Sequence, residues 1–117
     1  MAPEARTYLW DARRAADAVA RFIAGKDRDD YLGDDLLRSA VERQFEIVGE
    51  ALSQLGKASP ALLARLPDAR NAIGFRNVLI DGYAEVDGAI VWRAATEALP
   101  RLRSAVATLL SELGDPP

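Results

Sequence analysis

The residues with the clearest chemical potential lie in one segment, 74–83, which reads Gly-Phe-Arg-Asn-Val-Leu-Ile-Asp-Gly-Tyr. Arg76, Asp81 and Tyr83 bring a guanidinium, a carboxylate and a phenol together in this short stretch. If one helix runs through it, Arg76 and Tyr83 are seven residues apart and share a face, with Asp81 beside them. Because a guanidinium is a rigid fork of donors, the segment could bind a phosphate or a carboxylate, and the phenol could contact a ligand or be modified.

The same segment has a plainer structural interpretation. Arg76 and Asp81 would form an ion pair that ties down the end of a helix, and Tyr83 would be a half-buried aromatic side chain of the core. Spacing alone favours this interpretation. Whether the segment has a chemical role therefore depends on what the rest of the chain contributes.

The composition removes several classes of chemistry. The chain has no histidine and no cysteine, which excludes the commonest general base, the commonest metal ligand and all disulfides. We therefore expect no metal and no cofactor. The net charge of −3 argues against a broad nucleic-acid-binding surface but allows a local basic pocket. The apolar runs are too short to cross a bilayer and the first residues do not resemble a secretory signal, so we expect a cytoplasmic protein without a membrane partner.

Helical spacing of apolar residues dominates the chain, which has 117 residues and is 50% hydrophobic. No stretch of useful length alternates between polar and apolar residues, so no sheet is expected. A chain of this length forms one domain, which we expect to cover residues 1–117. The sequence therefore predicts an all-α protein, an antiparallel bundle of four to five helices.

Glycines should end the first two helices. The first is expected to stop near Gly25, and the polar stretch 26–30 is expected to be a loop. The second should run from about Leu36 to Leu55, be capped by a preceding aspartate and be closed by Gly56. Its apolar residues occupy more than one face, so it must be buried on more than one side, either at the centre of the bundle or against a second subunit.

Proline and aspartate residues divide the second half of the chain. Pro60 is typical of the first position of a short helix, with Ser59 as its cap. Asp68 is typical of a cap for the third helix, which carries the apolar residues from Ile73 to Ile80 and is interrupted at Gly82. Asp87 should cap a last helix. Pro100 should kink or break this last helix, because the proline ring removes a donor and clashes with the preceding turn.

Several stretches of the chain are similar to one known family. The string Arg76-Asn77-Val78-Leu79-Ile80-Asp81-Gly82-Tyr83 resembles the R-N-x-L-x-H-x-Y signature of HepT-type toxins, the DUF86 branch of the HEPN superfamily. Residues 38–51 look like the family's second-helix pattern, and Pro67 resembles the residue that precedes its motif helix. The landmarks of its last helix are matched by Val86-Asp87, Val91-Trp92 and Leu99-Pro100-Arg101-Leu102. The resemblance thus covers nearly the whole chain.

The resemblance implies a small HEPN-like bundle that forms a homodimer, with two copies of an R-x4-6-H motif meeting in a cleft. By the same resemblance, that cleft would be a metal-independent endoribonuclease site that acts on RNA, including tRNA. The implied partner is a minimal nucleotidyltransferase antitoxin, which in some pairs silences the toxin by AMPylation of the motif tyrosine. On this sequence, Arg76 and Asn77 would bind RNA phosphate, Arg76 and Asp81 would hold the catalytic positions, and Tyr83 would accept the AMP.

Asp81 departs from the family at its most important position, because it stands where the motif has histidine and no other histidine can replace it. RNA cleavage by the 2′-hydroxyl needs a base to take that proton and an acid to protonate the leaving 5′-oxygen. A carboxyl group with the ordinary aspartate pKa of about 3.9 is ionised near neutral pH and serves only as the base. Because each acid–base contribution is worth roughly 10²–10⁴-fold, we expect a large loss of activity.

Three functions remain open on the sequence alone. The first is the toxin component of a HEPN–nucleotidyltransferase toxin–antitoxin pair, an endoribonuclease whose activity Asp81 reduces. The alternative is a non-catalytic helical binding subunit that partners a nucleotidyltransferase. The third is a structural helical dimer in which Arg76 and Asp81 only form an ion pair. Asp81 itself has two explanations, a natural divergence that retains binding or an inactivating replacement of a histidine.

Overall fold

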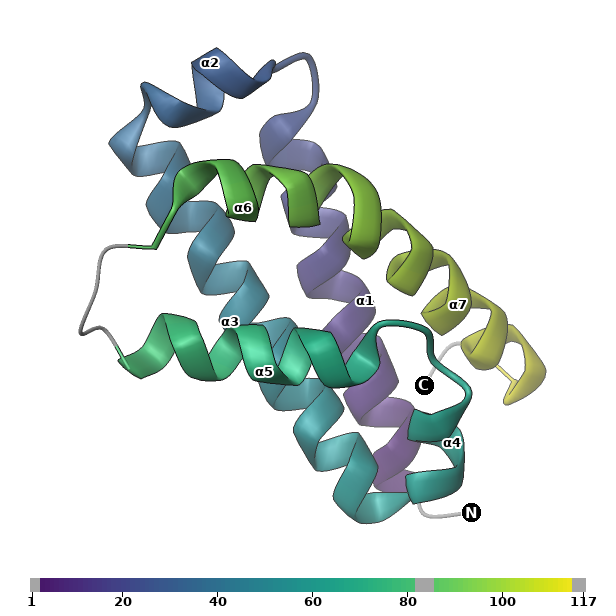
Figure 1. The fold of residues 1–117 in the computed structure, drawn as a ribbon. Helices are drawn as coiled ribbons and strands as arrows, with labels where there is room; N and C mark the ends of the chain where they lie inside the picture. The colour runs from purple at the N-terminus through teal and green to yellow at the C-terminus, as the bar shows by residue number, and fades with distance from the viewer. Residues whose placement is uncertain (1–2, 82–85, 115–117) are drawn as a thin grey trace.

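Helices account for nearly all of residues 3–81 and 86–114, which are the residues that the computed structural model describes (Figure 1). In chain order they are α1 (Pro3–Ile23), α2 (Arg28–Leu32), α3 (Asp35–Ala58), α4 (Pro60–Ala64), α5 (Ala69–Asp81), α6 (Gly88–Arg93), a π-helical segment η1 (Ala94–Ala98) and α7 (Leu99–Glu112). These ranges contain no strand, so the predicted all-α class is confirmed. None of these helices combines the length and the apolar character that a membrane span requires.

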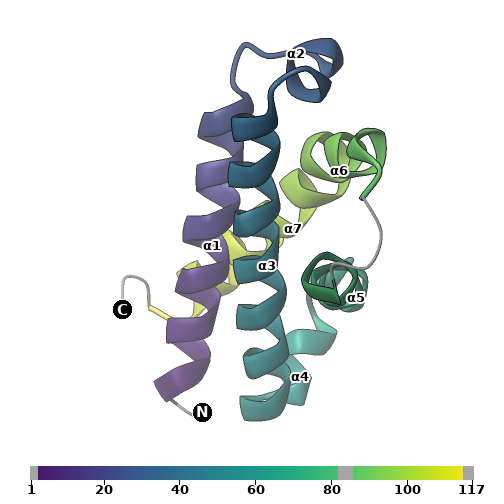
Figure 2. The same ribbon diagram turned by 90° about the vertical axis from the view of Figure 1, so that its left-hand side faces the viewer.

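The core lies between α1, α3 and α7, and the first two of these helices run antiparallel (Figure 2). Apolar residues spaced by three and four along α1 form one stripe, and all of them are buried: Leu9, Ala12, Ala16 and Val19. They meet a second stripe on α3, formed by Val41, Phe45, Val48, Leu52 and Leu55. No charged side chain is buried in the described part of the chain. Each fully buried Leu or Val stabilises the fold by roughly 1.5–3 kcal/mol, so this seam holds the scaffold together.

The polar stretch 26–30 is more ordered than the sequence predicts, because α2 begins within it. The Asp30 N–H donates to Asp27 Oδ1 at 2.8 Å, and the Asp27 N–H donates to Asp30 Oδ2 at 3.0 Å. This reciprocal capping box satisfies the free donors of the first turn. Tyr31 then becomes fully buried, with its ring 5.5 Å from that of Trp92. The predicted loop is therefore wrong, and α2 fastens α6 to the bundle.

Gly56 does not end α3, which continues to Ala58. A Cβ atom at Gly56 would lie 2.8 Å from Leu63 Cδ2, so the glycine makes room for α4 rather than closing the helix. The start of α3 is as predicted, because Asp34 caps it by accepting from the Leu37 N–H at 3.0 Å. Ser59 likewise caps α4.

Pro100 bends the last helical stretch without breaking it. The path from α6 to α7 stays helical and changes direction along η1 (Figure 1). Pro100 lies in the first turn of α7, where its missing N–H costs little, and the wider π turn immediately before it absorbs the irregularity. Asp87 caps α6 as predicted, by accepting from the Ala89 N–H at 2.9 Å.

Candidate functional site

The site helix α5 crosses α3 at a glycine. A Cβ atom at Gly49 would lie 2.2 Å from Arg76 Cβ and 3.0 Å from the Ala72 carbonyl oxygen, distances that no ordinary side chain tolerates. Glycine therefore permits the close approach of the two helices, and α5 runs across α3 at a steep angle (Figure 1). The crossing fixes the stem of Arg76 against the backbone of α3.

The guanidinium of Arg76 is held by two oxygen acceptors. Its Nη2 lies 2.6 Å from Glu50 Oε2, and its Nη1 donates to Asn77 Oδ1 at 3.0 Å. Gln54, one turn further along α3, donates from Nε2 to the other carboxylate oxygen of Glu50 at 3.0 Å. The Arg76 side chain is 27% exposed and that of Glu50 is 49% exposed. The arginine is therefore oriented at the surface but already has a carboxylate partner.

Asp81 is the last residue of α5 and is exposed. Five residues of helix separate it from Arg76, which turns its side chain by about 140° away from that of the arginine. Among the described residues Arg76 pairs with Glu50 and no ion pair joins it to Asp81, so the structural ion pair that spacing favoured is wrong. The carboxylate instead stands at the negative end of the helix dipole.

Asn77 and Tyr83 complete the predicted set. Asn77 is exposed, and its amide oxygen accepts from Arg76, so its amide group remains oriented beside the guanidinium. Tyr83 and Gly82 lie outside the described residues, and α5 ends one residue before them. The structure thus brings Arg76 and Asn77 together near the middle of α5 and places Asp81 at the C-terminal end of the same helix.

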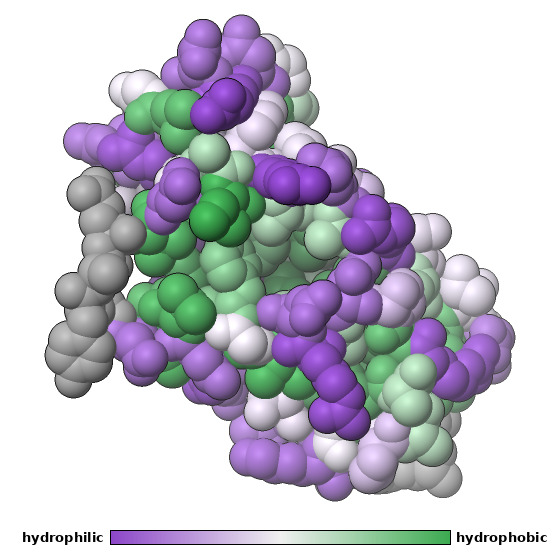
Figure 3. Space-filling view, in the orientation of Figure 1, coloured by the Kyte–Doolittle hydropathy of each residue, from purple (hydrophilic) through white to green (hydrophobic). Residues whose placement is uncertain are grey.

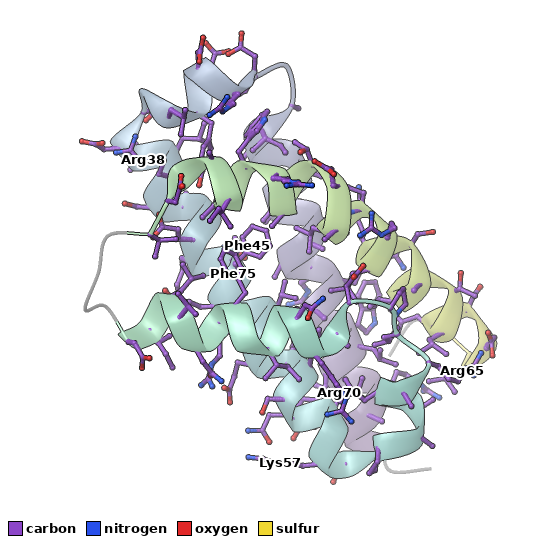
Figure 4. The ribbon with its side chains drawn as sticks, viewed as in Figure 1. Arg38, Phe45, Lys57, Arg65, Arg70 and Phe75 are labelled. Carbon is purple, nitrogen blue, oxygen red and sulfur yellow. The ribbon has the colours of Figure 1, made fainter. Side chains whose placement is uncertain are left out.

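An apolar pocket lies where α5 faces α6 and η1. The rings of Phe45 and Phe75 meet edge to face, with their centroids 5.2 Å apart, in the space between α5 and α6 (Figure 4). They line a cavity of about 230 Å³ together with small residues of η1, and Asp68 and Asn71 stand among its lining residues. Figure 3 shows this hollow as an apolar depression in the face of the molecule. Asp68, expected to cap α5, directly precedes the helix, and its carboxylate accepts from Arg101 at 3.2 Å.

Comparison with known proteins places the chain in a family. Residues 12–109 match the family described as Ribonuclease HepT-like. The chain belongs to this family. The resemblance in its sequence is thereby confirmed, and it extends to curated relatives. "Probable ribonuclease HepT" of Thermococcus cleftensis is 30% identical over 84% of this chain and 88% of its own length. "Putative RNase MJ1380" of Methanocaldococcus jannaschii is 26% identical over 88% of this chain and 94% of its own length. No solved structure matches the chain significantly.

The sequence analysis gave no role to two residues of this candidate site, Gly49 and Glu50. A glycine inside a long, strongly helical stretch lowers the stability of the helix by about 1 kcal/mol relative to alanine. Gly49 in the sequence therefore indicates a position where close packing requires glycine. Glu50 gave no such signal, because an exposed glutamate on a helix is most often a solvated side chain. Its role depends on the crossing with α5, which no local pattern reveals.

A second surface feature adjoins Glu50. A groove of about 530 Å³ runs between α1 and α3, and Glu50 lines its edge. The side chains along it carry both signs of charge, with arginines and carboxylates in equal number: Arg14, Arg21, Arg43, Asp11, Glu46 and Glu50. The floor between them is apolar and includes Ile47 and Ala51. These six charges balance, so like-charge repulsion would not oppose the approach of another protein surface.

Proposed function

We propose that this chain is the toxin subunit of a HepT-type pair, an endoribonuclease by descent that binds RNA at Arg76 and whose cleavage Asp81 reduces. The observation that carries this proposal is the guanidinium of Arg76, fixed by the Gly49 crossing and oriented at the surface by its partners. Membership of the HepT-like family and the ribonuclease names of its relatives support it. RNA, tRNA included, is the proposed substrate.

The division of labour in the site follows from its chemistry. Arg76 would bind a non-bridging phosphate oxygen, and the amide of Asn77 would donate a further hydrogen bond to it. Asp81 would face the scissile bond from the end of α5, where its charge adds to the negative end of the helix dipole. The aspartate charge and the dipole both repel a phosphate. A protonated histidine at that position would instead be stabilised by the negative end of the dipole and could act as the acid. The proposal therefore explains why histidine suits this position and aspartate weakens it.

Cleavage by two forms of the chain tests this proposal. The purified chain and its Asp81→His variant should be incubated with tRNA, and the products should be resolved by electrophoresis. We expect the histidine to raise the rate by at least about 100-fold, because it restores general acid–base catalysis. Robust cleavage by the chain as it stands, abolished in Asp81→Asn, would instead make the carboxylate competent and the proposal of a weakened site wrong.

The active form is proposed to be a homodimer that places both copies of Arg76 and Asp81 in one cleft. The groove between α1 and α3 supports this, because a two-fold interface pairs one surface with itself and the charges that line this groove balance. Ile80, four residues after Arg76 and on the same face of α5, is 50% exposed and adds an apolar contact. Light scattering at micromolar concentration should give the mass of two chains, and a monomeric mass would contradict the dimer.

The proposed partner is a minimal nucleotidyltransferase antitoxin, and Tyr83 is the proposed acceptor of AMP. The tyrosine oxygen would attack the α-phosphorus of ATP, lose its proton and release pyrophosphate. Incubation with the transferase, ATP and Mg²⁺ should add one or more adenylates to the intact mass, and Tyr83→Phe should prevent the addition. An unchanged mass with a transferase that is active on another substrate would overturn this assignment.

A non-catalytic binding subunit is the second candidate, and one observation favours it. The ion pair of Arg76 with Glu50 means that the phosphate-binding group is already occupied within the chain. If this candidate is correct, neither the chain nor Asp81→His cleaves RNA, yet the chain co-purifies with the transferase. The cleavage assay above therefore separates the two.

A further inference from the structure

Glu50 occupies the group that the proposed function assigns to RNA phosphate. The contact between Arg76 Nη2 and Glu50 Oε2, at 2.6 Å, is a close ion pair. A phosphate oxygen that binds the same edge of the guanidinium must take the place of this carboxylate. RNA binding at Arg76 is therefore an exchange of one anion for another.

The structure provides for this exchange. The stem of Arg76 is pinned at the Gly49 crossing, so only its head needs to turn. Glu50 keeps a hydrogen bond when the guanidinium leaves, because Gln54 Nε2 already donates to its Oε1 at 3.0 Å. Since the Glu50 side chain is 49% exposed, water can replace the lost ion pair, and pairs at such exposure are weak. The carboxylate can thus hold the arginine without trapping it.

We propose that Glu50 is the positioning residue of the site: it orients Arg76 in the free chain and sets the strength of RNA binding, because the phosphate exchanges with its carboxylate. This inference rests on the proposed function of Arg76 in binding RNA. It assigns to α3 a part in a site whose recognised residues all lie on and after α5. Because the Glu50 carboxylate already pairs with the guanidinium, Arg76 binds a polyanion only after this ion pair opens.

A salt titration of tRNA binding tests the inference. Fluorescence anisotropy with labelled tRNA should compare Glu50→Gln with Glu46→Gln, a matched control that removes the same charge one turn earlier on α3, from the ion pair with Arg43. We expect Glu50→Gln to bind roughly fivefold more tightly than the control. The affinity of Glu50→Gln should also fall more steeply with salt: the slope of log K against log salt concentration should be steeper by about one unit. The reason is that Arg76 then contacts a phosphate without competition from the carboxylate. Glu50→Asp, which keeps the charge, should bind like the parent chain.

The Arg76→Ala background separates the inference about Glu50 from the proposed binding of RNA by Arg76. The advantage of Glu50→Gln over Glu46→Gln should vanish there, since the carboxylate acts only through the guanidinium. If Arg76→Ala weakens binding but Glu50→Gln matches the control, the proposed function stands and this inference is wrong. If Arg76→Ala leaves tRNA binding unchanged in every background, Arg76 is not the phosphate-binding group and both are wrong. Equal melting temperatures of the variants should accompany each comparison.

Discussion

The helices α3 and α5 touch at one crossing, yet they are anchored in different ways. α3 buries eight residues along two faces, whereas α5 buries only Ala69 and Leu79. Besides these two, α5 packs three half-buried apolar residues against the core, among them Phe75 against Phe45, and it is held by the Gly49 crossing. The scaffold helix thus supplies stability, and the site helix is free to expose polar and apolar groups to a ligand or a partner. Substitutions in the buried stripe of α3 should therefore affect mainly stability, whereas substitutions around the crossing and on the exposed side of α5 should affect mainly function.

The largest effect is expected in the scaffold. Leu52 of α3 is fully buried, so Leu52→Ala should lower the free energy of unfolding by about 2–5 kcal/mol through lost burial and a residual cavity. Leu36 near the start of the same helix is 80% exposed, so Leu36→Ala should change the free energy of unfolding by less than about 0.5 kcal/mol. Urea denaturation measures both. Similar values for the two variants would contradict the assignment of α3 as the core helix.

A smaller effect is expected at the crossing. Gly49→Ala places a methyl group 2.2 Å from Arg76 Cβ, so it should cost roughly 1–3 kcal/mol and weaken RNA binding by moving the arginine. Gly74→Ala on α5 is the control, because a Cβ atom there has no neighbour within 4 Å and alanine favours the helix by up to about 1 kcal/mol. Thermal melts and tRNA binding check both. A Gly49→Ala variant with unchanged stability and binding would show that the helices do not approach so closely.

The smallest effect is electrostatic and also lies on α3. Burial raises the pKa of Glu42 above its usual value of 4.5, while Arg38 opposes the shift and Glu46 adds to it. The folded chain therefore holds this proton more tightly than the unfolded chain, so the group's stabilising contribution is full below pH 4.5 and is lost as the pH rises through the folded pKa.

Replacement of Glu42 by glutamine removes this dependence. Glu42→Gln should melt at a higher temperature than the parent chain at about pH 7, and the difference should become small at about pH 4, where most of the Glu42 carboxyl is protonated. Differential scanning calorimetry at the two pH values checks this. A lower melting temperature of Glu42→Gln at neutral pH would mean that its ion pairing outweighs the cost of burial.

Local signals in the sequence predicted most of the fold. Asp34, Ser59 and Asp87 cap helices as expected, because a capping side chain acts on a backbone N–H two or three residues away. The same kind of signal is present at Asp27 and Asp30, where a capping box begins α2 within the predicted loop. The prediction that Gly56 ends α3 is wrong, because a glycine that ends a helix and one that makes room for a neighbouring helix look alike in sequence.

The site could be predicted only in part, for a physical reason. Arg76, Asn77 and Asp81 were correctly placed on one helix, but the partner of Arg76 was not, because Glu50 reaches it through a contact between two helices. The spacing of residues within one segment does not predict contacts between two helices. It also suggested that Arg76 and Asp81 pair, although five residues of helix turn the two side chains apart.

The central claim, that Arg76 on the lightly anchored α5 is the phosphate-binding group of a ribonuclease site, is tested most directly in the Asp81→His background. In that background tRNA cleavage should be compared for Arg76→Ala and for Arg70→Ala, which removes the same charge from an exposed position of the same helix. We expect Arg76→Ala to lose roughly 10²–10³-fold in cleavage rate and Arg70→Ala to lose little. Equal losses in both variants, or full activity in Arg76→Ala, would contradict the account.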